Sequence, residues 1–114
     1  MKQFTDAVQT AQLMQLGFPS PKGVSKLSLD WDMDTVPTFN YSIGELIEML
    51  PPYIKYNGRA VGISKNYYSL TIRRNEVMYC DPYMDWIEEQ CKDHDELIDN
   101  LLDMIIKLKE EKLI

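Results

Sequence analysis

Residues 68–80 read YSLTIRRNEVMYC, a sequence that predicts a β-hairpin in the middle of the chain. From Tyr68 to Arg73, apolar residues alternate with polar ones, as they do along a strand that buries one face. Asn75-Glu76 is predicted to form the turn, after which the chain returns as the partner strand. Asp81-Pro82 is predicted to end the sheet, because proline cannot donate a ladder hydrogen bond.

Two further stretches extend this β region. Residues 53–80 as a whole are predicted to be antiparallel, with Asn57-Gly58 as a tight turn. Nearer the N-terminus, residues 27–34 read LSLDWDMD and give the clearest single strand, because their four apolar residues occupy every second position. Strands separated by such turns favour an antiparallel sheet.

Two helices are predicted on either side of the strand at residues 27–34. The first runs from Thr5 to Leu16, with Thr5 as its N-cap and Gly17 ending it in a left-handed conformation. The second reads SIGELIEML from Ser42 onward, and Glu45 follows Ser42 at the spacing of a capping box. The two prolines after it end the helix, because neither can continue a helical ladder.

The chain closes with the longest predicted helix. Residues 83–91 are predicted to form a turn or a short helix, and a stronger helical pattern starts at Asp93, with Glu96 completing a capping-type start. Acidic residues dominate its first turns and lysines its end, which suits the helix dipole. Apolar residues cover more than half of its circumference. The helix is therefore either buried within one chain or shared with a second copy as a homodimer.

These elements predict an α+β fold in a single domain, residues 1–114. It consists of a small antiparallel sheet of three or four strands, with an N-terminal helix, a short middle helix and a long C-terminal helix packed on it. The hydrophobic fraction of 45% supports a core without metal or disulfide bonds, so Cys80 and Cys91 are predicted to be free thiols. No leader and no apolar run of about 20 residues is recognised, which predicts a cytoplasmic protein that does not engage a membrane.

Charge is distributed unevenly along the chain. The net charge is −6, yet residues 53–75 contain five basic residues and no acidic one. Tyrosines beside lysines and arginines on a sheet are a common way of holding single-stranded nucleic acid. The stretch therefore keeps open an alternative function associated with nucleic acid, although the overall acidity disfavours it. The residues predicted to contact nucleic acid or another partner are Tyr56, Arg59, Tyr67, Arg73 and Arg74.

Residues suited to catalysis are few. Asp30, Asp32 and Asp34 alternate along a predicted strand and could hold Mg²⁺ or Ca²⁺ in a metal-dependent enzyme, although a solvated strand face is the simpler interpretation. Cys91 and His94 are three residues apart, but the sequence supplies no third residue that orients them. No nucleotide-binding, hydrolase or metalloprotease motif appears. The sequence therefore predicts no catalytic residue, no cofactor and no metal site.

Three segments carry a resemblance to a known group of proteins. They are QTAQLMQLGFP at residues 9–19, YSIGELIEMLP at 41–51, and SLTIRRNEVMYC at 69–80 continued by DELIDNLLDMIIKLKEEKLI at 95–114. In these segments the chain resembles small proteins encoded by phages, prophages and related mobile elements of Bacteroides-type gut bacteria. The resemblance implies a phage-derived accessory protein, and it brings no catalytic residue. The lack of chemical motifs, the acidic surface and the apolar closing helix favour an accessory protein that acts by protein–protein interaction with an unidentified protein partner.

Overall fold

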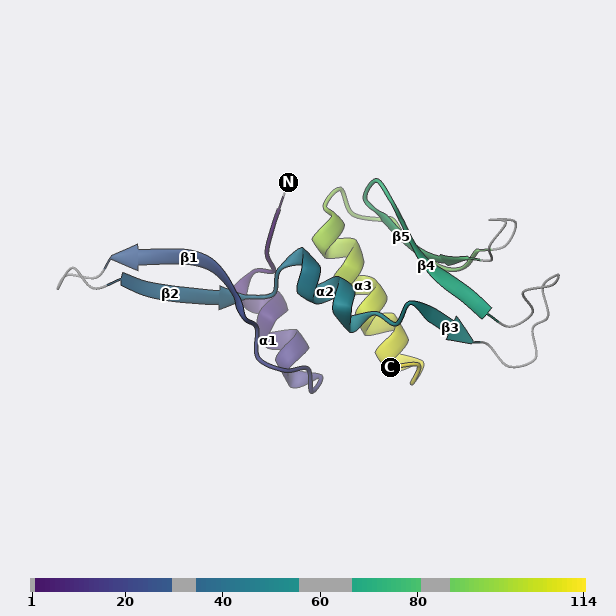
Figure 1. The fold of residues 1–114 in the computed structure, drawn as a ribbon, viewed down its shortest axis with the longest axis horizontal. Coiled ribbons are helices and arrows are strands. Elements are labelled where there is room, and N and C mark those ends of the chain that lie inside the picture. Colours follow the sequence, from purple (N-terminus) through teal and green to yellow (C-terminus); the bar gives the residue numbers. More distant parts are fainter. Residues whose placement is uncertain (1, 30–34, 56–66, 81–86) are drawn as a thin grey trace.

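The computed structural model describes residues 2–29, 35–55, 67–80 and 87–114, which form three helices and two antiparallel sheets (Figure 1). The helices are α1 (Ala7–Gln15), α2 (Ile43–Met49) and α3 (Leu97–Glu110). A two-stranded ribbon consists of β1 (Gly23–Leu29) and β2 (Thr35–Asn40). A four-stranded sheet runs in the order β3 (Tyr53–Lys55), β4 (Tyr67–Arg73), β5 (Glu76–Cys80) and β6 (Ile87–Cys91).

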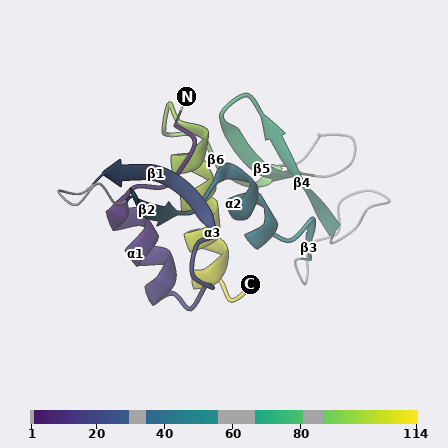
Figure 2. The same ribbon diagram turned by 60° about the vertical axis from the view of Figure 1, so that its left-hand side comes forward.

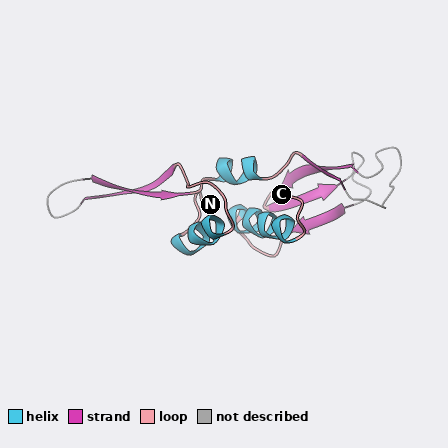
Figure 3. Cartoon of the chain, turned by 90° about the horizontal axis from the view of Figure 1, so that it is seen from below, coloured by secondary structure: helices cyan, strands magenta, loops and turns pink. Residues whose placement is uncertain are grey.

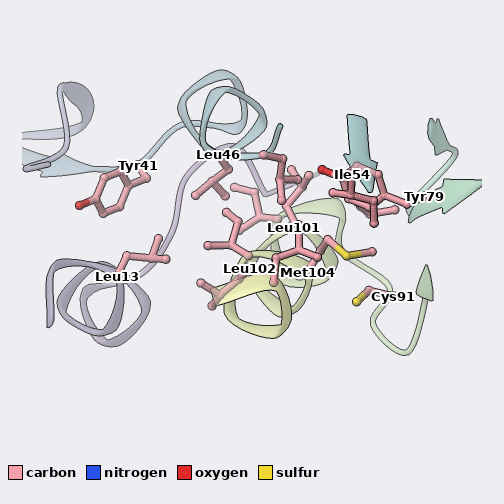
Figure 4. Packing of buried hydrophobic residues seen from close by; sticks show 14 of the residues in the cluster. Leu13, Tyr41, Leu46, Ile54, Tyr79, Cys91, Leu101, Leu102 and Met104 are labelled. Carbon is pink, nitrogen blue, oxygen red and sulfur yellow. The ribbon is translucent and has the colours of Figure 1, made fainter. Parts of the chain in front are cut away.

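The predicted α+β class and the small antiparallel sheet are confirmed. α3 lies against the four-stranded sheet, where it contacts β5 and β6, and α2 packs on α3 (Figure 2). The core therefore forms around α3, whose fully buried residues include Leu101, Met104 and Ile105. Leu46 of α2 and Tyr79 of β5 belong to the same cluster (Figure 4). Because the apolar face of α3 is buried within one chain, a second copy is not needed to cover it.

The hairpin predicted at residues 68–80 is confirmed, with its turn one residue earlier than expected. β4 pairs with β5 so that Arg73 lies opposite Glu76, which leaves Arg74 and Asn75 as the two turn residues. Arg74 adopts a φ of 57°, in the left-handed region that residues with a side chain seldom occupy. The alternation along β4 thus predicted the strand correctly. The positive φ of Arg74 was not predictable from the sequence, because arginine is not a residue that typically adopts it.

The strand β6 overturns two predictions. Residues 83–91 were expected to form a turn or a short helix, and the sheet to end at Asp81-Pro82. Instead Ile87–Cys91 pairs antiparallel with β5, with Cys91 opposite Val77. The physical reason is that Glu89, an acidic residue, is 7% exposed and pairs with Lys107 of α3, with 2.7 Å between the Nζ and the Oε2. Because glutamate occupies this buried position, residues 87–91 lack the apolar alternation by which a strand is recognised in a sequence.

The helix ends follow the predictions in part. Gly17 has a φ of 94° and ends α1, and the Phe18 amide donates back to the Leu13 carbonyl at 3.3 Å. The capping box of α2 is confirmed, since the Glu45 amide donates to the Ser42 hydroxyl and the Glu45 carboxylate accepts from the Ser42 amide, both at 3.2 Å. The cap predicted at Asp93 is wrong, because α3 starts after Glu96 and has no side-chain cap.

The β1–β2 ribbon extends from the body along the long axis of the molecule, whose dimensions are 63 × 27 × 19 Å (Figure 3). The strand predicted at residues 27–34 is confirmed over residues 27–29, and residues 30–34 lie outside the described part of the chain. β2 is a strand that the sequence pattern did not predict, since Pro37 disfavours a strand interior. It pairs with β1 in a ribbon of two edge strands, with Pro37 opposite Leu27.

Buried hydrogen bonds fix the base of this ribbon to α1. The Thr5 and Thr10 hydroxyls are 2.7 Å apart, and Thr10 in turn donates to the Asn40 side chain. The Thr5 hydroxyl also accepts from the Tyr41 amide at 3.0 Å. Thr5 is thus engaged away from the helix end, and Asp6 caps α1 by accepting from the Gln9 amide at 2.8 Å. The N-cap predicted at Thr5 is therefore wrong.

Gly23 is the position at which the ribbon leaves the body, and replacing it with alanine is expected to lower the free energy of unfolding by about 2 kcal/mol. A Cβ there would lie 2.7 Å from the backbone oxygen of Asn40 and 2.8 Å from Oε1 of Glu45. The backbone oxygen cannot move aside without distorting the ribbon register, in which Gly23 pairs with Asn40. Urea unfolding of Gly23→Ala measures the loss.

Gly44→Ala is the matched control for this substitution. Gly44 lies in α2, and a Cβ there would meet nothing nearer than the Ser42 hydroxyl at 3.9 Å. Alanine is favoured over glycine within a helix by about 0.5–1 kcal/mol, so Gly44→Ala is expected to be neutral or stabilising. Equal losses in the two variants would contradict the close approach at Gly23.

Candidate functional site

The structure places two of the five predicted contact residues at one corner of the sheet. Arg73 ends β4 and Arg74 lies in the following turn, and both are exposed. Tyr67 begins β4, whereas Tyr56 and Arg59 lie outside the described residues. Asp30, Asp32 and Asp34 also lie outside them. In the residues that are described, no three His, Cys, Asp or Glu side chains are grouped to hold a metal ion.

Two residues that the sequence analysis did not connect with the arginines join them at this corner. A hollow of about 440 Å³ is lined by the β4–β5 turn and by the segment after β6. We call Arg73, Arg74, Lys92 and His94 the basic corner. Sequence spacing could not have joined them, because the hairpin turn and the segment after β6 are far apart along the chain and are brought together by the pairing of β5 with β6.

A fully buried amide holds the two segments of the basic corner together. The side chain of Asn100, on α3, donates to the Asn75 carbonyl at 2.6 Å and to the His94 carbonyl at 3.0 Å. Its oxygen accepts from the His94 amide at 3.1 Å. The Asn75 side chain donates across to the Asp95 carbonyl. An asparagine within the apolar pattern of a helix is the sequence signal that could have indicated this contact.

A second hollow lies between α2 and the segment that follows α1. This cavity of about 350 Å³, which we call the α1–α2 groove, is lined mainly by apolar atoms. Tyr41 forms a buried part of its wall, and its hydroxyl donates to the Pro19 carbonyl. The lining residues are Phe18, Pro19, Ser20, Lys22, Tyr41, Glu45, Glu48 and Met49. The groove is not apparent from the sequence, because helix and turn patterns account for each of its segments separately.

The two carboxylates of the groove differ in what they bind. Glu45 accepts from the Lys22 amide at 2.9 Å and from the Ser42 amide at 3.2 Å. Burial alone would raise the pKa of Glu45, but these bonds, with one from the Gly23 amide, outweigh it and lower that pKa. Glu48 is exposed and has no hydrogen bond or ion pair within the described part of the chain. Glu48 is therefore the carboxylate available to a partner.

The cysteine and histidine near the end of the sheet do not form a nucleophilic pair. Burial raises the pKa of the Cys91 thiol to about 11, an effect that the nearby Lys107 only partly offsets. At neutral pH Cys91 is thus a thiol, whereas a nucleophile has to be a thiolate. His94 contacts Asp103 instead, with 2.8 Å between the Nε2 and the Oδ2. Both described cysteines, Cys80 and Cys91, are buried and free, as predicted.

The lowered pKa of Asp99 makes the stability of the fold depend on pH in the acidic range. Burial alone would raise its pKa, but hydrogen bonds from Gln9 at 2.7 Å and Lys2 at 3.0 Å outweigh it and lower the pKa. A lowered pKa in the folded state stabilises the fold above the unfolded-state value, about 3.9. That stabilisation disappears as the pH falls through the folded-state pKa. We expect the free energy of unfolding to decrease when the pH is lowered below about 4.

Urea unfolding over a pH series measures this dependence, with Asp99→Asn as the variant. The variant is expected to show a shallower acid loss than the wild-type protein, because its amide does not titrate. Asp93→Asn makes the same substitution at an exposed position and serves as the control. An unchanged slope in Asp99→Asn would contradict the role given to the Lys2 and Gln9 contacts.

No family model, no curated protein and no solved structure matches this chain. The resemblance to phage and prophage proteins therefore remains a prediction. Among the described residues, no helix has the length and apolar character needed to cross a membrane.

Proposed function

We propose that this protein is a non-catalytic accessory protein that binds another protein, and that a segment of the partner enters the α1–α2 groove. The observation that carries the proposal is an apolar cavity of about 350 Å³ with the unengaged carboxylate of Glu48 among its lining residues. Binding sites of this kind are concave and mainly apolar, with few polar groups that orient the occupant. The occupant we propose is a lysine or arginine side chain of the partner.

Charge and shape both favour such an occupant. The aliphatic stem of a lysine or arginine would lie against Phe18 and Met49, while its charged end would reach Glu48. The net charge of −6 attracts a basic partner at long range.

The C-terminal helix is not part of this proposal. A homodimer through α3 would need its apolar side chains at the surface, whereas Ile98, Leu101, Leu102, Met104, Ile105 and Leu108 are buried within the chain. The expected origin in a phage or prophage of Bacteroides-type gut bacteria indicates where to search, namely in a lysate of such a host.

Affinity capture from that lysate, after nuclease treatment, tests the proposal with three tagged proteins. Wild-type protein and Glu110→Lys are expected to retain the same partner, and Glu48→Lys is expected to lose it. Glu110 is an exposed acidic residue at the end of α3, so Glu110→Lys repeats the charge reversal away from the groove. Circular dichroism establishes that all three are folded. Equal recovery by Glu48→Lys and wild type would contradict the groove as the binding site.

A peptide library displayed against the purified protein tests the partner chemistry without a lysate. Peptides that bind are expected to share a lysine or arginine next to an apolar residue, and to lose binding to Glu48→Lys. Selection of acidic peptides, or of peptides that bind Glu48→Lys equally well, would count against a basic occupant.

A further inference from the structure

We infer that the basic corner is a second binding site, separate from the groove, and that it takes a small phosphate ester of nucleotide size. The β4–β5 turn and the end of β6 bring three cations together. Arg73, Arg74 and Lys92 are exposed, and none of them has a side-chain hydrogen bond or an ion pair within the described residues. Guanidinium groups bind phosphate through paired, charge-assisted hydrogen bonds.

The corner is held in place before any ligand arrives. Asn100, which is 0% exposed, bonds to the backbone of Asn75 in the hairpin turn and of His94 in the other segment. The ring of His94 is held by Asp103 at 2.8 Å. The two segments that carry the cations therefore keep a fixed separation, which reduces the conformational entropy lost on binding.

The backbone at Arg74 supports a functional reading of the turn. Its φ of 57° is one that glycine adopts without strain, whereas an arginine adopts it at some cost in stability. Within the described residues, the exposed side chain of Arg74 makes no hydrogen bond or ion pair that would compensate for the cost. A guanidinium that contacts a ligand at this position is the compensation we infer.

The charges that line the hollow decide which phosphate compound fits. Besides the three cations and His94, the hollow is lined by the carboxylates of Glu76 and Asp95. The formal surplus is thus close to a single positive charge, which matches one phosphate group and not a run of phosphates. The net charge of −6 also repels a long polyanion. A hollow of about 440 Å³ is large enough for a phosphate with an attached nucleoside.

Isothermal titration calorimetry with three probes tests the inference: adenosine monophosphate, inorganic phosphate, and a single-stranded DNA of about ten nucleotides. We expect saturable binding of adenosine monophosphate, with weaker binding of inorganic phosphate and of the DNA. Arg73→Gln and Arg74→Gln are each expected to weaken binding about tenfold, the effect of losing a charge-assisted hydrogen bond. Lys112→Gln removes the same charge at an exposed position beyond α3 and is expected to bind as wild type.

Each other result overturns a stated part of the inference. No saturable binding of any probe, or unchanged binding in both arginine variants, overturns the site itself. Tighter binding of the DNA than of adenosine monophosphate overturns the preference for a small ester and shows an extended nucleic-acid surface. Equal binding of inorganic phosphate overturns the nucleotide size. Glu48→Lys is expected to bind adenosine monophosphate as wild type does, so failure of the groove proposal and failure at the corner are distinguishable.

Discussion

Replacing Leu101 with alanine is expected to lower the free energy of unfolding by about 3–4 kcal/mol, the largest effect of any single substitution we consider. Leu101 is 0% exposed and lies on the helix that contacts both the sheet and α2. The substitution loses the free energy gained by burying the removed side-chain atoms. It also leaves a cavity, which the elements packed on two sides of α3 prevent from closing. Urea unfolding followed by circular dichroism measures the change.

Two controls separate the cavity from other effects at this position. Leu101→Met conserves most of the volume and is expected to cost less than about 1.5 kcal/mol. Val8→Ala shortens an apolar residue that is 76% exposed on α1, and it is expected to change stability by no more than about 0.5 kcal/mol. A loss of less than about 1 kcal/mol in Leu101→Ala would mean that α3 does not lie at the centre of the core.

Where the interactions are local, the sequence predicted the fold well. The hairpin at residues 68–80 has its alternation within one strand, and the capping box of Ser42 and Glu45 spans three residues. Prediction failed at β6, because the burial of Glu89 depends on Lys107, a residue 18 positions away on another element. It failed at Thr5 for the same reason, because Thr10 and the ribbon base engage that hydroxyl.

The candidate sites were less predictable than the fold. Arg73 and Arg74 were identified from the basic stretch. Lys92 lies between the turn or short helix predicted at residues 83–91 and the predicted start of the closing helix, and His94 lies at that start. The α1–α2 groove needs the loop after α1 to meet α2, and the only sequence feature of that loop is its turn composition. Sequence patterns describe which residues share an element, whereas both sites depend on which elements meet.

Replacing Asn100 with alanine is expected to lower the free energy of unfolding by about 3 kcal/mol. Unlike the replacement of Leu101, this substitution removes no large apolar side chain from the core. The side chain makes three hydrogen bonds, one to the backbone of Asn75 and two to that of His94. Without this side chain, which is fully buried, those backbone groups lose their hydrogen-bond partner. An unpaired buried group costs its full desolvation penalty.

Hydrogen exchange at the His94 amide distinguishes this clamp from general destabilisation. In Asn100→Ala the amide is expected to exchange faster relative to the core amides of β5, because it loses its acceptor while the sheet keeps its ladder. Asn75→Ala removes only the exposed bond to the Asp95 carbonyl, so a loss of about 0.5–1 kcal/mol is expected there. If Asn100→Ala costs no more than Asn75→Ala, the two segments of the basic corner are held by other contacts. The fixed separation of the cations that favours phosphate binding would then come from those contacts and not from Asn100.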